Sequence, residues 1–300
     1  MSRRHLLMLL ALAAMWGASF LLIKICVREL APTTLVCLRL GIGALALAPL
    51  AVARLGRRRF VAEARPALSR LVAIGLVNSA IPIVSLSWAE TRIDSGLAAV
   101  IQASAPLFTA LLALRFARRE RVQGSRLLGL LVGFGGVALL VGVQPSGNVL
   151  AALAVTFSAF CYAVAALYTA RAVARVAPLV TATVALTAAA VALLPFAIVQ
   201  RPAHFPSWGV VAALLGLSLG GTSVGYVLYY ELLAGAGASR SILITYLVPA
   251  LALVYGVTLL GEPLTVAAVV GLALVLAGVA LGTSIVSLRR RREQVTPVGG

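Results

Sequence analysis

The chain has 300 residues, of which 62% are hydrophobic and 11% are charged, and its formal net charge is +17. This apolar content is far more than a water-soluble domain of this size can bury, which excludes an ordinary soluble protein. In a soluble protein the positive charge would indicate nucleic-acid binding. Here it lies between long apolar runs, so it indicates membrane topology and we expect no nucleic-acid partner.

Apolar runs of about 18–23 residues follow one another along the chain, each long enough to cross a hydrocarbon core of ~30 Å as a helix. Strands are not expected, because period-two alternation is absent and backbone groups in lipid must be paired within the segment. The sequence therefore predicts an all-α membrane protein with ten transmembrane helices, over residues 6–26, 32–53, 68–89, 95–114, 126–143, 149–170, 178–199, 208–230, 238–259 and 264–287.

The two halves of the chain repeat each other. The segment Gly129–Leu140 recurs as Gly271–Gly282, and Pro106 corresponds to Pro249. A period of roughly 142 residues in this chain means two copies of one unit, which is a common construction in secondary transporters. Each unit holds five spans, and because five is odd the second copy must enter the membrane from the opposite face.

This repeat divides the chain into four segments. We expect a first five-helix repeat over residues 1–144, a short linker over 145–148, a second inverted five-helix repeat over 149–288, and a basic cytoplasmic tail over 289–300.

The basic residues are distributed unevenly between the two sides of the predicted membrane. With the N-terminus inside, 20 of the 25 basic residues lie in inside loops, and only four lie outside, namely Lys24, Arg28, Arg92 and Arg201. By the positive-inside rule both termini are then cytoplasmic. We expect a multi-pass protein of the cell membrane, specifically of the bacterial inner membrane.

Several short segments carry a resemblance to a known family. They are Trp16-Gly-Ala-Ser-Phe20 with Lys24 and Arg39-Leu40, then Ser95-Gly-Leu-Ala-Ala-Val100 with Ser104-Ala-Pro-Leu-Phe-Thr109 and Glu120, and finally Leu260-Gly-Glu-Pro-Leu-Thr265. Together they resemble an EamA-type member of the drug/metabolite transporter superfamily, over essentially the whole chain.

The resemblance implies a ten-helix bundle of two inverted five-helix repeats around a central cavity. It implies a secondary active transporter that exports a small metabolite, such as an amino acid, by alternating access. It does not imply one substrate, because the family handles amino acids, drugs, sugars and nucleotide sugars. We expect a small-molecule substrate and contact with the lipid bilayer, and protons are the candidate coupling ion.

Two cations within or near spans are candidates for substrate binding. Arg39 lies about seven residues inside the second span, and Lys24 lies near the outer end of the first; both match the family pattern. An ionisable group within a span is costly, so it should face a cavity or a partner. The alternatives are that Arg39 bonds helix carbonyls as a packing clamp and that Lys24 extends to the membrane interface.

Polar and aromatic side chains recur at helical spacing on several spans and are candidates for the rest of the substrate lining. In such a bundle, many polar positions form only interhelical hydrogen bonds, so about half of these are expected to be structural. The candidates are Trp16, Asn78, Ser85, Gln102, Tyr226, Tyr229 and Thr245. Thr222 lies on the same side of the eighth span as Tyr226, and Tyr162 and Phe160 could form an aromatic wall with Trp16 or simply fill the core.

Two carboxylates occupy related positions in the two halves. Glu90 closes the third span and Glu231 closes the eighth, each two residues after an aromatic side chain. A carboxylate at a helix C-terminus opposes the helix dipole, so neither is explained as a cap. One hypothesis is that one of them titrates and couples proton entry to export. The alternative is ion pairing, of Glu90 with Arg92 and of Glu231 with a cytoplasmic arginine.

Proline and glycine residues within spans indicate bending and close packing. Pro82, Pro106 and Pro249 free backbone groups and kink helices, which makes them candidates for gating, although static kinks are equally common. Glycines at small-xxx-small spacing on the fifth and tenth spans indicate close helix contact, which we expect within the chain. The sequence leaves open whether the protein is a monomer or a homodimer.

Two other classes compete with a transporter. An enzyme is not expected, because both histidines are peripheral, acidic residues total eight, and no catalytic or metal-binding motif occurs. We therefore expect no catalytic residue, metal or cofactor. A facilitative channel or exchanger for small solutes stays open, and saturable counterflow in liposomes distinguishes a carrier from a pore.

Overall fold

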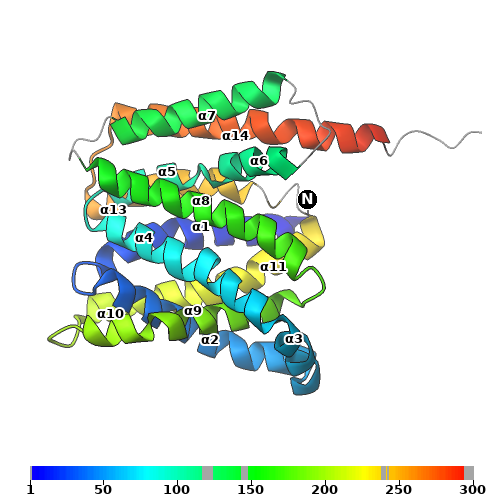
Figure 1. Cartoon of the computed structure of the whole chain (residues 1–300). Helices are drawn as coiled ribbons and strands as arrows, with labels where there is room; N and C mark the ends of the chain where they lie inside the picture. The colour runs from blue at the N-terminus through cyan, green and yellow to red at the C-terminus, as the bar shows by residue number, and fades with distance from the viewer. Residues whose placement is uncertain (1, 117–123, 143–147, 238–240, 242, 294–300) are drawn as a thin grey trace, which may run out of the picture.

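The protein is entirely helical over the residues that the computed structural model describes, which are 2–116, 124–142, 148–237, 241 and 243–293 (Figure 1). The elements in chain order are α1 Arg3–Cys26, α2 Pro32–Leu55, α3 Arg57–Gly75, η1 Leu76–Ala80, α4 Ile81–Glu90, α5 Ser95–Gln102, α6 Ala105–Phe116, α7 Gly124–Gly142, α8 Val149–Ala172, α9 Pro178–Val199, α10 Trp208–Leu215, η2 Gly216–Val224, α11 Gly225–Ala236, α13 Ile244–Leu260 and α14 Val266–Glu293. The segments η1 and η2 are π-helical.

These elements join into the spans that the sequence predicts. Within the described ranges, seven continuous helices are long and apolar enough to cross a membrane, and three shorter helices are apolar. The third span is continuous from α3 through η1 to α4, and the eighth from α10 through η2 to α11. The predicted all-α membrane fold is therefore confirmed. The third span differs in that its helix begins at Arg57, well before residue 68.

Local sequence explains where several helices begin and end. Pro32 and Pro178 occupy the first turn of α2 and of α9, where a missing amide costs nothing. Gly56 separates α2 from α3 with a φ of 79°, a left-handed conformation that favours glycine. The fourth span breaks between α5 and α6, where Pro106 lies in the first turn of the second piece.

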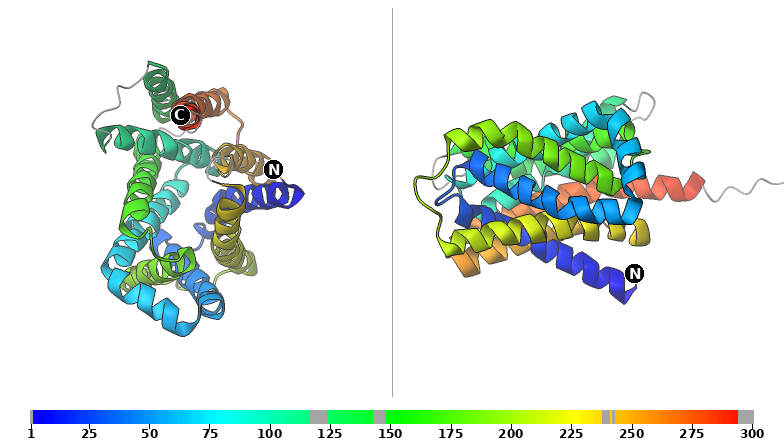
Figure 2. Two further views of the ribbon diagram at one scale, coloured as in Figure 1. Left: turned by 90° about the vertical axis from the view of Figure 1, so that its right-hand side faces the viewer. Right: turned by 90° about the horizontal axis from the view of Figure 1, so that it is seen from below.

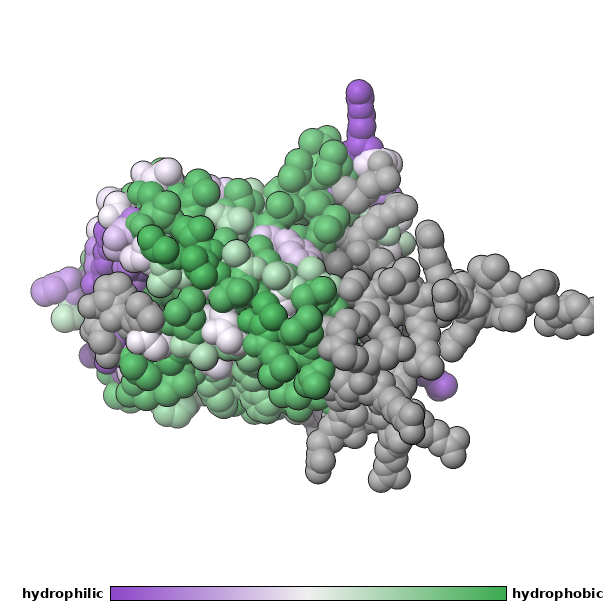
Figure 3. Space-filling model, turned by 90° about the horizontal axis from the view of Figure 1, so that it is seen from above, coloured by the Kyte–Doolittle hydropathy of each residue, from purple (hydrophilic) through white to green (hydrophobic). Residues whose placement is uncertain are grey.

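Seen end-on, the helices surround the middle of the bundle, and α7 and α14 lie together at one side (Figure 2). Both α1 and α14 have their free end at the same end of the bundle as the α2–α3 turn (Figure 1). The face formed over α7 and α14 is largely apolar, and hydrophilic residues gather at one end of it (Figure 3). This surface suits contact with lipid tails.

The contact between α7 and α14 depends on glycine. A Cβ atom on Gly278 would collide with the backbone of Gly133 and with the carbonyl of Gly129, and one on Gly136 would meet Leu274. The glycines therefore let these two helices pack within one chain, as expected from their spacing. The helices run in opposite directions (Figure 1), while the inverted relation of the whole repeats stays a prediction.

Three carboxylates join one half of the chain to a helix N-terminus in the other half. Glu29 accepts hydrogen bonds from the amide and hydroxyl of Ser207, at 2.7 and 2.6 Å, where α10 begins. Glu63 accepts from the amide of Ala177 at 2.6 Å, where α9 begins. Glu262 does the same for α5 and is described below. Each carboxylate satisfies free amides and faces the positive end of a helix dipole.

Candidate functional site

The two π-helical segments lie at related places in the third and eighth spans. Within η2 the hydroxyl of Thr222 donates to the carbonyl of Leu217, and that of Ser223 donates to Ser218. Both pairs are five residues apart, so these side chains match the wider π-helical turn. Such segments are uncommon and occur often at functional sites.

Arg39 of α2 lies beside η2. Its Nε donates to the Thr222 hydroxyl at 3.1 Å, and the side chain is partly buried. Among the described residues its two terminal nitrogens have no hydrogen-bond partner and no carboxylate forms an ion pair with it. Arg39 is thus a cation at mid-span whose outer face is available to an anion.

Tyrosines from two other spans surround Arg39. Tyr162 of α8 and Tyr226 of α11 lie within electrostatic range of the guanidinium, and Tyr226 also interacts with Asn78 and Ser79 of η1. We call Arg39, Asn78, Tyr162, Thr222 and Tyr226 the central cluster. Its residues come from four spans, and each of the two π-helical segments contributes one of them.

All five members of the central cluster are sequence candidates for the lining. Arg39, Asn78 and Tyr226 are predicted directly, Thr222 lies on the same polar side of the eighth span as Tyr226, and Tyr162 belongs to the aromatic wall that the sequence suggests. Only the polar spacing on η2 indicates Thr222 from sequence, and nothing local places Tyr162 beside Arg39. That contact depends on how α8 packs against its neighbours.

Two other predicted lining residues lie together next to the cluster. The indole nitrogen of Trp16 donates to the carbonyl of Gly221 at 3.0 Å, and its ring packs against Tyr229 with centroids 5.5 Å apart. A Cβ on Gly225 would come within 2.7 Å of that nitrogen. Trp16 therefore holds α1 against η2 and α11.

The remaining predicted lining residues are scattered. The hydroxyl of Ser85 donates to the carbonyl of Ile81 in its own helix, which is a structural role. Gln102 ends α5, and its buried Oε1 has no partner among the described residues. Thr245 is partly buried near the start of α13.

The three predicted kink prolines lie in different settings. Pro82 follows η1 in the first turn of α4, and Pro106 follows the break before α6. Pro249 is buried inside α13. Two of the three thus coincide with interruptions of α-helical geometry, and whether these positions bend during transport stays a prediction.

Lys24 binds backbone carbonyls near one end of the bundle. Its Nζ donates to the carbonyls of Glu90 and Ile93 at 2.7 and 2.8 Å. These carbonyls lie at and just after the C-terminal end of α4, where a cation satisfies free acceptors and complements the helix dipole. Lys24 is therefore not a member of the central cluster, and its part in substrate binding stays a prediction.

The two candidate coupling carboxylates have opposite surroundings. Glu90 is completely buried, and neither carboxyl oxygen has a hydrogen-bond partner in the described part of the chain. The suggested partner Arg92 instead donates to Thr91 and Trp88 and stacks over the Trp88 ring at 4.0 Å. The predicted pairing of Glu90 with Arg92 is wrong.

Glu231 has the ion pairs that were the alternative to a coupling role. Its carboxylate contacts Arg4 at 3.3 Å and Arg54 at 3.4 Å. About a third of its side chain is exposed, so water reaches these pairs. These contacts agree with the ion-pairing alternative for Glu231, whereas Glu90 has no such partner in the described part of the chain.

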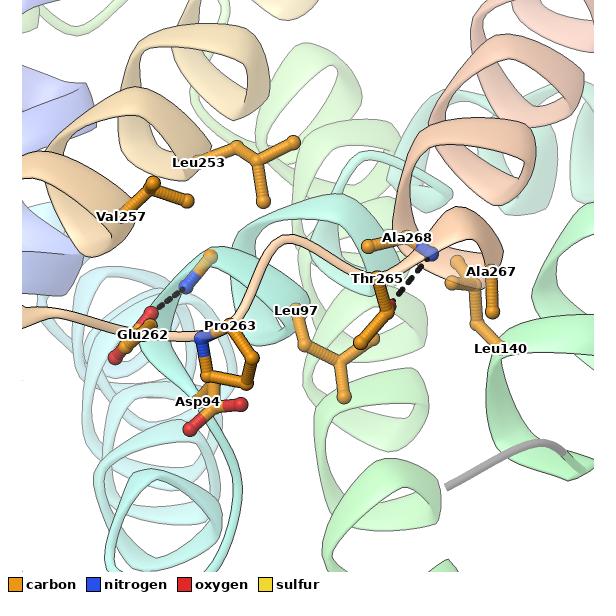
Figure 4. A pocket seen from close by; sticks show the side chains of 11 residues that line it. Asp94, Leu97, Leu140, Leu253, Val257, Glu262, Pro263, Thr265, Ala267 and Ala268 are labelled. Carbon is orange, nitrogen blue, oxygen red and sulfur yellow. Dashed lines mark hydrogen bonds between the residues drawn. The ribbon is translucent and has the colours of Figure 1, made fainter. Parts of the chain in front are cut away.

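Partly buried polar contacts hold the turn between α4 and α5. Glu262 accepts from the Ser95 amide and hydroxyl and from the Gly96 amide, at 2.8, 3.0 and 3.0 Å. A small open pocket lies beside it, with Asp94 and Pro263 on its wall (Figure 4). This pocket is away from the central cluster.

Two carboxyl groups in the connecting turns of this end have shifted pKa values. Burial raises the pKa of Asp94, Glu262 raises it further, and Lys24 lowers it. The pKa of Glu29 is lowered by the hydrogen bonds from the Ser207 side chain and backbone. No three His, Cys, Asp or Glu residues lie together as a metal site within the described ranges.

This architecture of apolar spans around a mid-membrane polar cluster defines a multi-pass membrane transport protein. The model of the EamA-like transporter family matches the chain twice, over residues 3–142 and 149–284. The chain therefore belongs to the EamA-like transporter family, and it is a transporter and not an enzyme.

Relatives of similar length support this assignment. An uncharacterized transporter of Archaeoglobus fulgidus is 29% identical, over 88% of this chain and 93% of its own. A probable terminal-alkyne amino-acid exporter of Streptantibioticus cattleyicolor is 32% identical, over 94% of both chains. An uncharacterized inner membrane transporter of Escherichia coli is 28% identical, over 97% of this chain and 94% of its own.

A solved crystal structure shares the fold. It has a TM-score of 0.67 and 21% sequence identity, and the match covers 95% of this chain and 99% of that one.

Proposed function

We propose that this transporter exports small amino acids and that Arg39 binds the carboxylate of the substrate. The observation that carries the proposal is a mid-span guanidinium whose terminal nitrogens have no partner among the described residues. A cation at a helix centre costs about 2.5–3.5 kcal/mol in the membrane, which an anionic ligand offsets. A guanidinium also pairs with a carboxylate through two parallel hydrogen bonds.

The neighbours of Arg39 suit an amino acid. Tyr162 and Tyr226 lie within electrostatic range of the guanidinium, so we propose that a substrate held by its carboxylate has aromatic side chains close by. The relative from Streptantibioticus cattleyicolor is named as an amino-acid exporter, which supports the same substrate class here.

We further propose that protons entering the cell drive export and that Glu90 carries the coupling proton. A buried carboxylate without a partner is costly in its charged form, and both oxygens of Glu90 are in that position among the described residues. We place the α2–α3 turn, with its neighbouring arginines, in the cytoplasm, by the positive-inside rule. Alternating access then exposes Arg39 to the two sides in turn.

The first experiment measures counterflow of radiolabelled L-alanine, L-leucine, L-phenylalanine and L-propargylglycine in proteoliposomes. Saturable counterflow of at least one is expected for the wild type, and its absence for all four would remove the amino-acid assignment. Arg39→Gln should lose about tenfold or more, since a charge-assisted pair is worth about 1.5–3 kcal/mol. Arg39→Lys should retain part of the counterflow, because the positive charge stays while the bidentate hydrogen bonding of the guanidinium is lost.

Arg92→Gln is the matched control, because Arg92 is an arginine at the end of a span, outside the central cluster, and its hydrogen bonds in the described structure go to Thr91 and Trp88. It should transport like the wild type. Equal counterflow by Arg39→Gln and the wild type would exclude Arg39 as the substrate site. Glu90→Gln should keep counterflow but no longer respond to an imposed pH gradient, and a normal response would exclude Glu90 as the proton carrier.

A further inference from the structure

Most of the buried side-chain oxygens that have no partner in the described structure lie on helices α4, α5 and α8 or at the break between α5 and α6, and the exception is Thr183 on α9. Among the described residues, side-chain oxygens of Ser87, Glu90, Gln102, Ser104 and Ser158 are buried and make no hydrogen bond. In folded proteins such atoms are nearly always satisfied, by protein or by ordered water. Five residues of this kind on adjoining helices therefore need a common explanation.

The helices that carry these five residues pack against one another. Helix α4, with Ser87 and Glu90, lies along α8, and α8 also packs on α5 and α6. Ser87 and Glu90 are three residues apart and so lie on one side of α4. Gln102 and Ser104 flank the break between α5 and α6, where the regular helical bonding is interrupted.

The five residues also span a continuous range of depth. Helix α4 ends at Glu90, and α5, α8 and α2 begin near the same end of the bundle (Figure 1). With a rise of ~1.5 Å per residue, Ser87 lies about 4.5 Å below Glu90, Gln102 about 10 Å below the start of α5, and Ser158 about 13 Å below the start of α8. Arg39 lies about 10 Å below the start of α2 by the same measure.

We propose that Glu90, Ser87, Gln102, Ser104 and Ser158 line a hydrated polar column that conducts protons between the α4–α5 end and the level of Arg39. Water molecules in it would satisfy the unpartnered oxygens, each bound by two to four polar groups. Serine hydroxyls and the Gln102 amide both donate and accept hydrogen bonds, so with water they relay a proton without holding a charge. The proposal rests on the proton coupling proposed above.

The groups around Glu90 fit the entrance of such a column. Helix α1 brings Lys24 and Cys26 into its electrostatic range, α2 brings Arg39, and the loop before α14 brings Glu262. A proton that arrives from the α4–α5 end meets Asp94 and Glu262 first, and then Glu90, the buried carboxyl group.

The test compares Ser158→Ala and Ser87→Ala with the wild type in proteoliposomes that enclose the dye pyranine and the four amino acids named above. After an external acid jump, internal acidification that depends on the amino acids reports coupled proton entry. Each variant removes one hydroxyl and should slow this acidification about fivefold to tenfold, since one relay contact is lost. Amino-acid counterflow needs no net proton movement and should stay unchanged.

Thr183→Val is the matched control. Thr183 is also buried with an unpartnered hydroxyl in the described structure, but it lies on α9, which packs on α2 and α3. It should leave both measurements unchanged. Wild-type coupling that persists fully in both serine variants, or an equal loss in Thr183→Val, would overturn the column. Counterflow without amino-acid-dependent acidification in the wild type would instead overturn proton coupling itself, and the column with it.

Discussion

The two ends of the bundle are held by different kinds of contact. At the α4–α5 end, Lys24 and Glu262 bind backbone groups on either side of one turn, at 2.7–3.0 Å. At the α2–α3 end, Glu231 joins Arg4 and Arg54 at 3.3 and 3.4 Å, and these two arginine side chains are 74% and 49% exposed. The contacts of Lys24 and Glu262 at the first end are partly buried helix caps, whereas those of Glu231 at the second end are solvated ion pairs. The second end also has the partly buried cap of α9 by Glu63.

This difference indicates which end opens more easily. A buried amide or carbonyl that loses its partner costs about 1–3 kcal/mol, whereas an exposed ion pair contributes about 0–1 kcal/mol and weakens in salt. The α4–α5 end should therefore stay closed while the α2–α3 end exchanges with solvent. Under the orientation and export direction proposed above, with the arginine-rich end in the cytoplasm, this is the arrangement in which the substrate is loaded.

The largest expected effect comes from removing the Glu262 carboxylate. Glu262→Ala leaves the Ser95 and Gly96 amides without their partner and removes a charge from the N-terminus of α5, a loss of about 2–3 kcal/mol. A fall in Tm should be seen by differential scanning fluorimetry in detergent. Glu63→Ala provides a comparison, because Glu63 caps α9 in the same way at the other end. A Glu262→Ala protein as stable as the wild type would contradict the closed-end interpretation.

Lys24→Met should open the same turn by a smaller amount. It removes two charge-assisted hydrogen bonds to the end of α4, for a loss of about 1–2 kcal/mol, and keeps most of the apolar stem. The measurement is maleimide labelling of Ile93→Cys, because Ile93 is only 3% exposed and should be protected in the closed turn. The background lacks the three native cysteines, Cys26, Cys37 and Cys161. Labelling of the Ile93→Cys thiol should be faster when Lys24→Met is present. Equal labelling with and without Lys24→Met would show that the Lys24 hydrogen bonds do not keep the turn closed.

The fold could be predicted from sequence because membrane spans follow from local composition. Runs of apolar residues long enough for lipid have few alternatives to helix, and the glycine spacing correctly indicates the α7–α14 contact. The π-helical segments were not predictable, because their wider turns depend on side chains such as Thr222 bonding five residues back. From the sequence, Pro106 predicts a kink in the fourth span but not the break between α5 and α6.

The site was only partly predictable. An ionisable residue in an apolar span is recognised from the sequence, but the residues that it contacts are not. Arg39 stands out by charge, and its electrostatic proximity to Tyr162 appears only in the folded structure. Lys24 and Glu262 illustrate the same limit. Both bind backbone groups far along the chain, and backbone acceptors and amides carry no sequence signal.

Breaking the ion pairs at the α2–α3 end should have a small effect. Glu231→Gln removes both pairs, and because these are long and solvated the loss should be at most ~1 kcal/mol. Raising NaCl to about 1 M should largely erase the difference between variant and wild type, because the screening length falls to ~3 Å. A Tm loss as large as that of Glu262→Ala, or one insensitive to salt, would remove the contrast between the two ends.

The smallest effects concern pH at the α4–α5 end, where two carboxyl groups should act with opposite signs. The pKa of Asp94 is raised, chiefly by burial, so its contribution to stability is present at acid pH and is lost as the pH rises through that raised value. Asp94→Asn stays neutral throughout. Its Tm should equal that of the wild type near pH 4 and exceed it by about 1–2 °C at pH 8.

The pKa of Glu29 is lowered by its hydrogen bonds from Ser207, so its contribution is present at neutral pH and is lost as the pH falls through the lowered value. Glu29→Gln should therefore be less stable than the wild type at pH 8, and the gap should close on acidification. The two variants are each other's control, since they lie at one end and share one solvent. If Tm changed with pH in the same way for both variants, local burial and helix capping would not control the pH dependence. The proposed difference between the α4–α5 end and the α2–α3 end would then lose this support.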